Sequence, residues 1–166
     1  MIDGNARDLF LKQIRENAGI IQKVVAIYTD TREDGEDLFQ EILYQSWKAF
    51  LTFRKESKFS TWLYRVSLNT ALVFRRNAKQ RETQGIDDTT VQPAVEPKFA
   101  NQETESLLRA IKSMQKIDRM IITLHLEGYS NAEIAETIGI TKENTAVKIH
   151  RIKKTLAEKL TSYEKH

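Results

Sequence analysis

The strongest constraint on the fold is a polar, acidic stretch, residues 82–98, which holds both prolines of the 166-residue chain. Proline lacks the backbone N–H that a helix needs, and the stretch shows no apolar periodicity, so it is typical of a linker. On both sides, apolar residues recur at the three- and four-residue spacing of amphipathic helices. The sequence therefore predicts an all-α fold of two small helical domains, residues 1–81 and 103–166, joined by a flexible linker over residues 82–102.

Three helical segments are predicted in the N-terminal domain. Apolar residues recur at helical spacing from Phe10 to Tyr28. A second helix is expected over residues 33–53, and a third is expected to begin after Ser60 and run to about Lys79. The second begins with four carboxylates, which the positive end of a helix dipole stabilises.

Capping residues mark the expected helix starts. Ser130 with Glu133 three residues later forms a capping box, and Gly139 then supplies the positive φ that ends a helix. The short helix between them carries Ala135, which allows close approach of a second helix. Further caps are predicted at Ser60, Asp118 and Thr141.

The last helix, from Thr141 to about Leu160, combines an apolar stripe with a basic outer face. The stripe expected to pack on the core consists of Thr145, Ile149, Ile152, Leu156 and Leu160. On the opposite face lie Asn144, Val147, Arg151 and Lys154, with Lys148 on the flank. Arg and Lys can bind phosphates or guanine edges, and Asn can bind adenine edges. The pattern favours a DNA-binding helix-turn-helix, and an ordinary helical hairpin with a basic exposed face is the plainer interpretation.

The formal net charge of +3 is distributed unevenly along the chain. Residues 54–81 carry a net charge of +7 and residues 148–166 carry +4, whereas residues 82–106 carry −5. Two basic segments separated by an acidic one favour two contacts with a polyanion, although two solvated helix faces would give the same charges.

Several classes of protein are disfavoured. The absence of cysteine excludes disulfides and thiol catalysis and fits a reducing compartment. Because no apolar run reaches the ~18 residues of a membrane span and no secretory signal opens the chain, we expect a cytoplasmic protein without membrane insertion. The three histidines, His125, His150 and His166, lack metal-ligand spacing, and no glycine-rich phosphate loop is present. We therefore expect no metal, no cofactor and no catalysis.

Four segments, taken in order, resemble a known family. Residues 36–41 read Glu-Asp-Leu-Phe-Gln-Glu, and residues 59–69 read Phe-Ser-Thr-Trp-Leu-Tyr-Arg-Val-Ser-Leu-Asn. Residues 128–135 read Gly-Tyr-Ser-Asn-Ala-Glu-Ile-Ala, and the basic Lys-Ile-His-Arg follows at residues 148–151. Over nearly its whole length the chain resembles bacterial RNA polymerase sigma factors of the extracytoplasmic-function class. The resemblance implies a sigma-two-like helical bundle and a sigma-four-like helix-turn-helix joined by a flexible linker.

The resemblance implies that the chain binds core RNA polymerase. In this family the Asp-x-x-Gln-Glu helix docks on the clamp helices of the β′ subunit, and the sigma-four domain also faces the β flap. The matching positions and their neighbours are Asp37, Leu38, Gln40, Glu41 and Ile42. A carboxylate bias on a solvated helix would explain the charges equally well, and the apolar side of this helix is more readily core than interface. An anti-sigma factor, which holds many members inactive, would be a further partner.

The second implied partner is promoter DNA, both single-stranded and duplex. The loop before Phe59 matches the loop that captures a base flipped from the minus-ten element, and Asn69 matches a position that holds the unpaired strand. The expected minus-ten contacts are Lys55, Glu56, Ser57, Lys58, Phe59, Ser60, Arg65, Asn69, Arg75 and Arg76. Lys79 and Arg81 would add to the positive charge along the strand. Trp62 and Tyr64 are candidates for stacking on bases, and Trp62 is more readily a core residue.

The last helix would read the minus-thirty-five duplex. The expected contacts are Lys142, Asn144, Val147, Lys148, Arg151 and Lys154. Members of the family often carry a basic residue where this chain has Ala146, so fewer polar side chains reach the groove and the promoter sequence is not predicted. A helix-turn-helix regulator that is not a sigma factor is the alternative. It explains residues 107–162 equally well but leaves residues 36–41 and 54–81 without a role.

Overall fold

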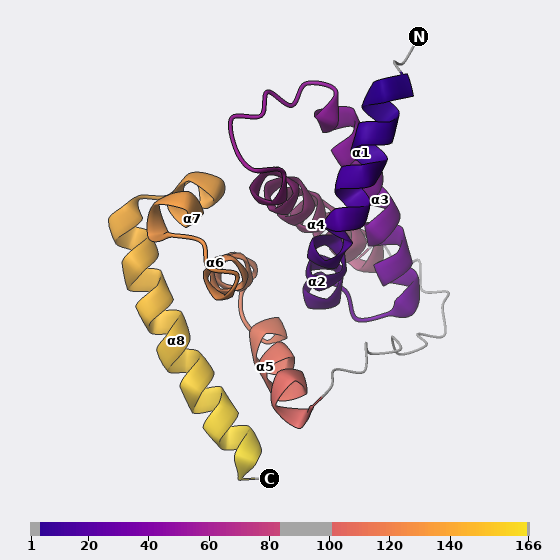
Figure 1. Cartoon of the computed structure of the whole chain (residues 1–166). Helices are drawn as coiled ribbons and strands as arrows, with labels where there is room; N and C mark the ends of the chain where they lie inside the picture. Colours follow the sequence, from indigo (N-terminus) through magenta and orange to yellow (C-terminus); the bar gives the residue numbers. More distant parts are fainter. Residues whose placement is uncertain (1–3, 84–100, 166) are drawn as a thin grey trace. The chain divides into compact units, whose positions relative to one another are not determined.

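A computed structural model describes residues 4–83 and 101–165, including their side chains except those of residues 75 and 78–83. Within these ranges the chain forms eight helices and no strand, which confirms the predicted all-α class (Figure 1). None of the described helices combines the length and the apolar character needed to span a bilayer.

The helices belong to two compact units, Met1–Pro97 and Lys98–His166. Most of the expected linker, residues 84–100, lies outside the described residues. Its two ends are helical, because one helix continues to Thr83 and the next begins at Gln102.

The first unit contains four helices, whose bounds are α1 (Gly4–Glu16), α2 (Ala18–Tyr28), α3 (Arg32–Phe50) and α4 (Phe59–Thr83). The apolar repeat between Phe10 and Tyr28 is divided between α1 and α2 by Asn17, whose φ of −120° and ψ of 15° depart from helical values. The Asn17 side chain donates to the backbone carbonyl of Gln13 at 2.8 Å, which satisfies an acceptor at the end of α1. Thr31 caps α3 by accepting from the backbone N–H of Asp34 at 3.1 Å.

The core of the first unit lies between α2, α3 and α4. Its fully buried apolar residues are Ile21, Val24, Leu38, Ile42, Leu63, Leu68 and Ala71. Gly35 lets α3 approach α2 closely, because a Cβ there would lie 3.3 Å from Val25 Cγ1. The predicted cap at Ser60 is wrong: α4 already begins at Phe59, and the Lys58 carbonyl accepts from the backbone N–H of Trp62 at 3.1 Å.

The second unit contains the other four helices, α5 (Gln102–Lys112), α6 (Lys116–Leu126), α7 (Asn131–Ile138) and α8 (Lys142–Glu164). The capping box at Ser130 and Glu133 is confirmed, with both of its reciprocal hydrogen bonds present. Gly139 ends α7 with φ of +84°, and Thr141 caps α8 by accepting from the Asn144 N–H at 3.1 Å, as predicted. The helix-turn-helix expected here is therefore formed by α7 and α8.

The α6 helix starts differently from the prediction. Gln115 is its N-cap residue, and Asp118 lies inside the first turn, so Asp118 does not cap the helix. The buried guanidinium of Arg119 instead secures the corner between α5 and α6, since its Nε donates to the Met114 carbonyl at 2.8 Å. Buried Arg is uncommon unless its donors are used.

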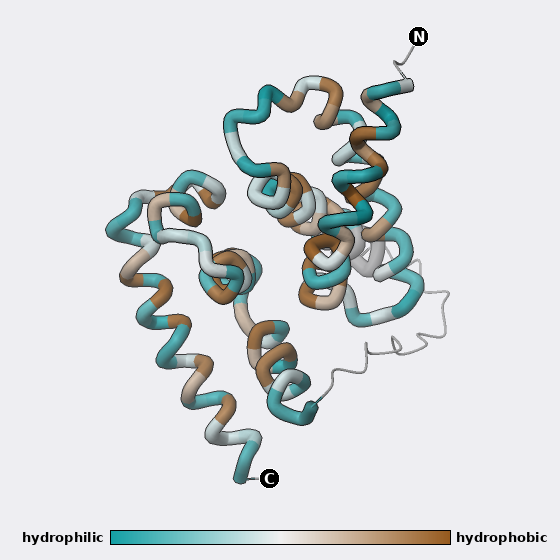
Figure 2. Tube along the Cα trace, viewed as in Figure 1, coloured by the Kyte–Doolittle hydropathy of each residue, from teal (hydrophilic) through white to brown (hydrophobic). Residues whose placement is uncertain are grey.

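The α8 helix packs along α5, α6 and α7 with its predicted apolar stripe (Figure 2). Thr145, Ile149, Ile152 and Leu156 are buried and Leu160 is half-buried, so the predicted face is confirmed. The hydroxyl of Thr145 donates to the Thr141 carbonyl at 2.9 Å, which makes a polar residue acceptable at this buried position.

Candidate functional site

An exposed polar face runs along α3. Asp37 and Gln40 are exposed, and the half-buried Glu41 accepts a hydrogen bond from Gln45 Nε2 at 2.8 Å. These three side chains of the expected polymerase-binding set lie on the surface of the first unit. They place two carboxylates and an amide within about one helical turn, a surface suited to basic and hydrogen-bonding groups of a partner.

The two apolar members of that set lie elsewhere. Leu38 and Ile42 have no solvent-exposed surface. They lie four residues apart on α3, on the side that packs against the core of the first unit. This part of the expectation is corrected: both residues hold α3 in place and are not available for direct contact with a partner.

The polar face of α3 extends further than the sequence motif indicated. Tyr44 is 56% exposed, and the Lys48 ammonium lies 5.3 Å from the centre of its ring. Tyr44 follows Glu41 by three residues, so it continues the same side of the helix. The three-residue spacing between Glu41 and Tyr44 is the feature of the sequence that indicates this shared face. Exposed tyrosines are frequent anchors of protein interfaces, which makes Tyr44 a candidate that the motif did not include.

A cluster of aromatic rings fixes the loop between α3 and α4, residues 51–58. Phe50 lies at ring-centroid distances of 6.1 Å from Phe59 and 6.2 Å from Trp62. Phe53 lies 4.9 Å from Trp62, and Phe10 on α1 lies 5.2 Å from Phe50. Trp62 packs in this cluster and is half-buried, so it lies at the edge of the core rather than within it.

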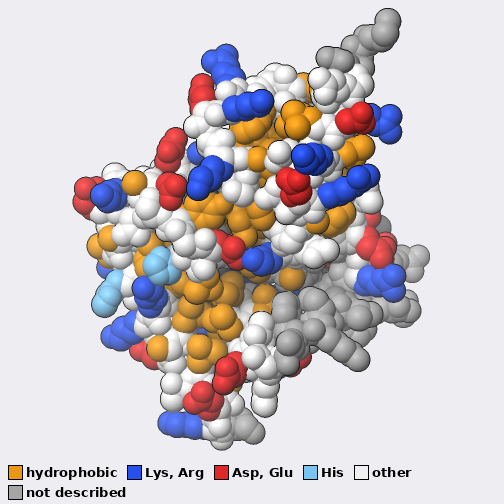
Figure 3. Space-filling model, in the orientation of Figure 1, with side chains coloured by type: hydrophobic (Ala, Val, Ile, Leu, Met, Phe, Trp, Pro, Cys, Tyr) orange, Lys and Arg blue, Asp and Glu red, His pale blue; other side chains and the backbone are white. Residues whose placement is uncertain are grey.

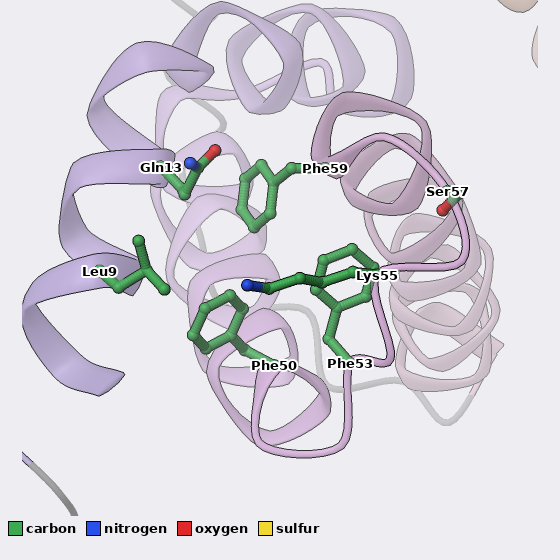
Figure 4. A pocket seen from close by; sticks show the side chains of 7 residues that line it. All are labelled: Leu9, Gln13, Phe50, Phe53, Lys55, Ser57 and Phe59. Atoms are coloured by element: carbon green, nitrogen blue, oxygen red, sulfur yellow. The ribbon is translucent and has the colours of Figure 1, made fainter. Parts of the chain in front are cut away.

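A hollow of about 290 Å³ opens beside this loop (Figure 4). It is lined by Leu9, Gln13, Phe50, Phe53, Lys55, Ser57 and Phe59. The exposed Lys55 side chain extends across it toward α1, and its backbone φ of +57° lies in the left-handed region. Such a conformation is unfavourable for a non-glycine residue, so the surrounding structure holds it in place. The hollow combines aromatic walls with a cation, a hydroxyl and an amide.

The remaining side chains expected at the minus-ten element differ in exposure. Glu56, Ser57, Lys58, Asn69 and Arg76 are exposed, whereas Ser60 and Arg65 are half-buried. Tyr64 is only 2% exposed, so it belongs to the core and cannot stack on a base as considered above. The side chains of Arg75, Lys79 and Arg81 lie outside those that the structure describes.

The outer face of α8 carries the side chains expected at the minus-thirty-five element. Lys142, Asn144, Val147, Arg151 and Lys154 are all exposed. Lys148 is half-buried on the flank, and its ammonium lies 4.0 Å from the Asp118 carboxylate of α6. Figure 3 shows Lys and Arg side chains along the edge that α8 forms. The structure also exposes Glu143 and His150 on this helix, which the expected set did not include.

One histidine of the second unit has a perturbed environment. Burial lowers the pKa of His125, and the positive charge of Lys153 on α8 lowers this pKa further. Both effects favour the neutral form of His125, which is half-buried on α6.

Comparison with known proteins identifies the family. Residues 13–81 match the family described as Sigma-70 region 2, and residues 104–156 match Sigma-70, region 4. The chain is 23% identical over 155 residues to the ECF RNA polymerase sigma factor SigM of Mycobacterium tuberculosis, covering 93% of this chain and 78% of SigM. It is 28% identical over 141 residues to the ECF RNA polymerase sigma-E factor of Escherichia coli K12, covering 76% and 74% of the two chains.

Solved structures show the same fold. The sigma factor RpoE of Bartonella quintana, in complex with the anti-sigma factor NepR, superimposes with a TM-score of 0.76 at 17% identity, covering 92% of this chain and 96% of RpoE. CnrH in complex with the cytosolic domain of CnrY gives a TM-score of 0.65 at 18% identity, covering 94% and 90% of the two chains. Two sigma-70 regions on an all-α chain define a transcription initiation factor with a DNA-binding helix-turn-helix. The chain belongs to the extracytoplasmic-function class of RNA polymerase sigma factors.

Proposed function

We propose that this sigma factor docks on core RNA polymerase with residues 1–81 and uses its two units on two promoter elements. Residues 1–81 would also hold the melted minus-ten strand, residues 103–166 would read the minus-thirty-five duplex, and residues 82–102 would connect them. The observation that carries the proposal is the division of α8, which buries one stripe in the core and exposes a basic and amide-bearing face.

Docking would use the polar face of α3 against the clamp helices of the β′ subunit. Asp37, Gln40 and Glu41 supply two carboxylates and an amide on a rigid helix whose opposite side is fully buried. Rigidity favours binding, because little side-chain and backbone freedom is lost on association. The second unit would contact the β flap through the part of its surface that stays free when α8 is bound to DNA.

Strand capture would use the loop over residues 51–58 and the adjacent hollow. Melting costs roughly 1.4 kcal/mol per base-pair step in lost stacking. Stacking of one base on an aromatic ring returns about 1–3 kcal/mol. The rings of Phe50, Phe53 and Phe59 line the hollow. The exposed Lys58 offers a cation just before α4, and the exposed Asn69 offers an amide ten residues into that helix. These groups together would offset the unstacking of a captured base.

Duplex recognition would use the exposed face of α8. Lys142 and Lys154 are suited to phosphate contacts, which position the helix, whereas Asn144 and Arg151 have the donors and acceptors that distinguish base edges. Lys148 would contribute from the flank, beside Asp118.

The proposal also includes a protein inhibitor of this sigma factor. The RpoE structure is a complex with the anti-sigma factor NepR, and the CnrH structure is a complex with the cytosolic domain of CnrY. We propose that an anti-sigma factor controls this chain by competing with core polymerase for the α3 face.

The test is run-off transcription with purified core polymerase on genomic fragments. We expect discrete start sites that require the protein as the only specificity factor. Asp37→Ala with Gln40→Ala should abolish the same transcripts, and Leu126→Ala, which changes an exposed residue of α6, serves as the matched control. Initiation no different from that of core polymerase alone would refute the proposed function.

A further inference from the structure

The outer face of α8 has an apolar side chain at its centre. Val147 is 50% exposed although it is apolar, and it lies on the same helix face as the exposed Asn144 and Arg151. At 100° per residue it lies about 160° around the helix from the fully buried Thr145. A face that enters a groove therefore presents Val147 at the position farthest from the core of the second unit.

The neighbours of Val147 give this position its chemical context. Asn144 lies one turn before it and Arg151 one turn after it, both exposed and both able to hydrogen-bond to base edges. Lys148 is directed back toward Asp118 of α6, with 4.0 Å between the charged atoms. Glu143, four residues before Val147, is the carboxylate on this part of the helix. The Val147 methyl groups are thus framed by polar side chains and have no core to pack on.

The major groove offers one apolar group on the base edges, which is the C5-methyl of thymine. We propose that Val147 contacts a thymine methyl in the minus-thirty-five element and thereby selects thymine at that position. The inference rests on the proposed function, in which α8 enters the major groove. Beyond that function, the inference specifies the base that Val147 recognises, thymine, and the group that it contacts, the C5-methyl.

The experiment uses the reconstituted holoenzyme, core polymerase with the full chain. Promoters are first selected from a library randomised over the minus-thirty-five region. In the tightest-binding promoter, each thymine of that region is then replaced in turn by deoxyuridine, which lacks only the methyl group. Burial of one methyl group stabilises by about 0.8 kcal/mol, so we expect one replacement to weaken binding by about fourfold.

The deciding comparison is with Val147→Ala. This variant should lose the sensitivity to that replacement and bind the thymine and deoxyuridine promoters equally. Because Val147 is exposed, the fold should survive, and unchanged circular dichroism checks this. Leu126→Ala, at a similarly exposed apolar residue of α6, should retain the fourfold sensitivity.

Two results would overturn the inference for different reasons. If every thymine tolerates replacement, or if Val147→Ala keeps the full sensitivity, Val147 does not read a methyl group. In that case Arg151→Ala would still weaken promoter binding, and the proposed duplex recognition would stand. If Arg151→Ala also leaves promoter selection unchanged, α8 does not enter the groove, and both the inference and that part of the proposed function are refuted.

Discussion

Replacement of Gly139 by Ala tests whether the turn between α7 and α8 depends on backbone conformation alone. Gly139 has φ of +84°, and a Cβ at this position would have no atom within 4 Å. Substitution therefore creates no clash. The free energy of unfolding should fall by about 1–2 kcal/mol, because an L-residue must be held in the left-handed region. The hydrogen bond from the Gly139 N–H to the Ala135 carbonyl, at 2.8 Å, keeps the residue in that conformation.

The assay is urea unfolding followed by two probes. Both tryptophans, Trp47 and Trp62, belong to the first unit, so their fluorescence follows that unit, whereas circular dichroism follows both. With a slope of roughly 1 kcal/mol per molar urea for a unit of this size, Gly139→Ala should lower the midpoint of the second unit by about 1–2 M. The fluorescence midpoint should not move.

Three control variants separate this cause from others. Gly128→Ala should cost about as much, because Gly128 has φ of +88° and equally free space. Gly139→Asn should cost less, since Asn tolerates the left-handed region. Gly19→Ala, at the second residue of α2 and without steric contact, should instead stabilise the first unit by about 0.4–1 kcal/mol. The reasoning would be refuted if Gly139→Ala lowered the stability of the second unit by less than about 0.3 kcal/mol, or if Gly139→Asn lowered it as much as Gly139→Ala.

Three further predictions concern binding and pH. Asp37→Ala with Gln40→Ala should weaken the affinity for core polymerase at least tenfold in a fluorescence binding assay, and unchanged affinity would show that α3 does not dock. Lys58→Ala or Asn69→Ala should reduce open-complex formation, followed by permanganate reactivity of unpaired thymines, by about tenfold for a lost hydrogen bond while core binding stays normal. Because the pKa of His125 is lowered in the folded protein, the unfolded chain binds more protons, so the stability of the second unit should fall as the pH drops below about 6.5. His125→Gln should remove this dependence in urea titrations at pH 5 and pH 7.

The features that could be predicted from sequence are those that depend on local chemistry. The capping box at Ser130, the left-handed Gly139 and the cap at Thr141 each involve atoms no more than four residues apart. The α8 stripe was predictable because a helix packed on one side repeats its apolar residues every three or four positions. For the same reason the exposed face with Asn144 and Arg151 followed directly from the sequence.

Two of the caps predicted from side-chain chemistry are wrong. Ser60 and Asp118 both have side chains that can cap a helix, but each lies inside the first turn of its helix. The α4 helix starts two residues earlier than predicted, where Phe59 packs against Phe50, Phe53 and Trp62. The packing of the Phe59 ring thus outweighs a cap worth about 1 kcal/mol. Such contacts cannot be derived from local spacing.

The candidate site was only partly predictable for a related reason. The motif around Asp37 marks residues of both sides of α3, and the structure places Asp37 on the surface and Leu38 against the core. The hollow beside the α3–α4 loop was not predicted at all, because Leu9 and Gln13 come from α1, more than 35 residues before the other lining residues. A cavity depends on tertiary packing, and single-sequence periodicity contains no information about it.

Core packing and the proposed strand capture would use the same side chains in the first unit. Phe50, Phe53 and Phe59 both line the hollow and hold the loop through ring contacts, so truncation of any of them alters stability and the hollow together. Lys55 differs, because it is exposed and has a backbone φ of +57° that glycine would adopt at lower cost. A strained lysine at a position better suited to glycine supports a role for its ammonium group in the proposed capture of DNA. We therefore expect that substitution of Lys55 changes the proposed DNA binding without loss of the core.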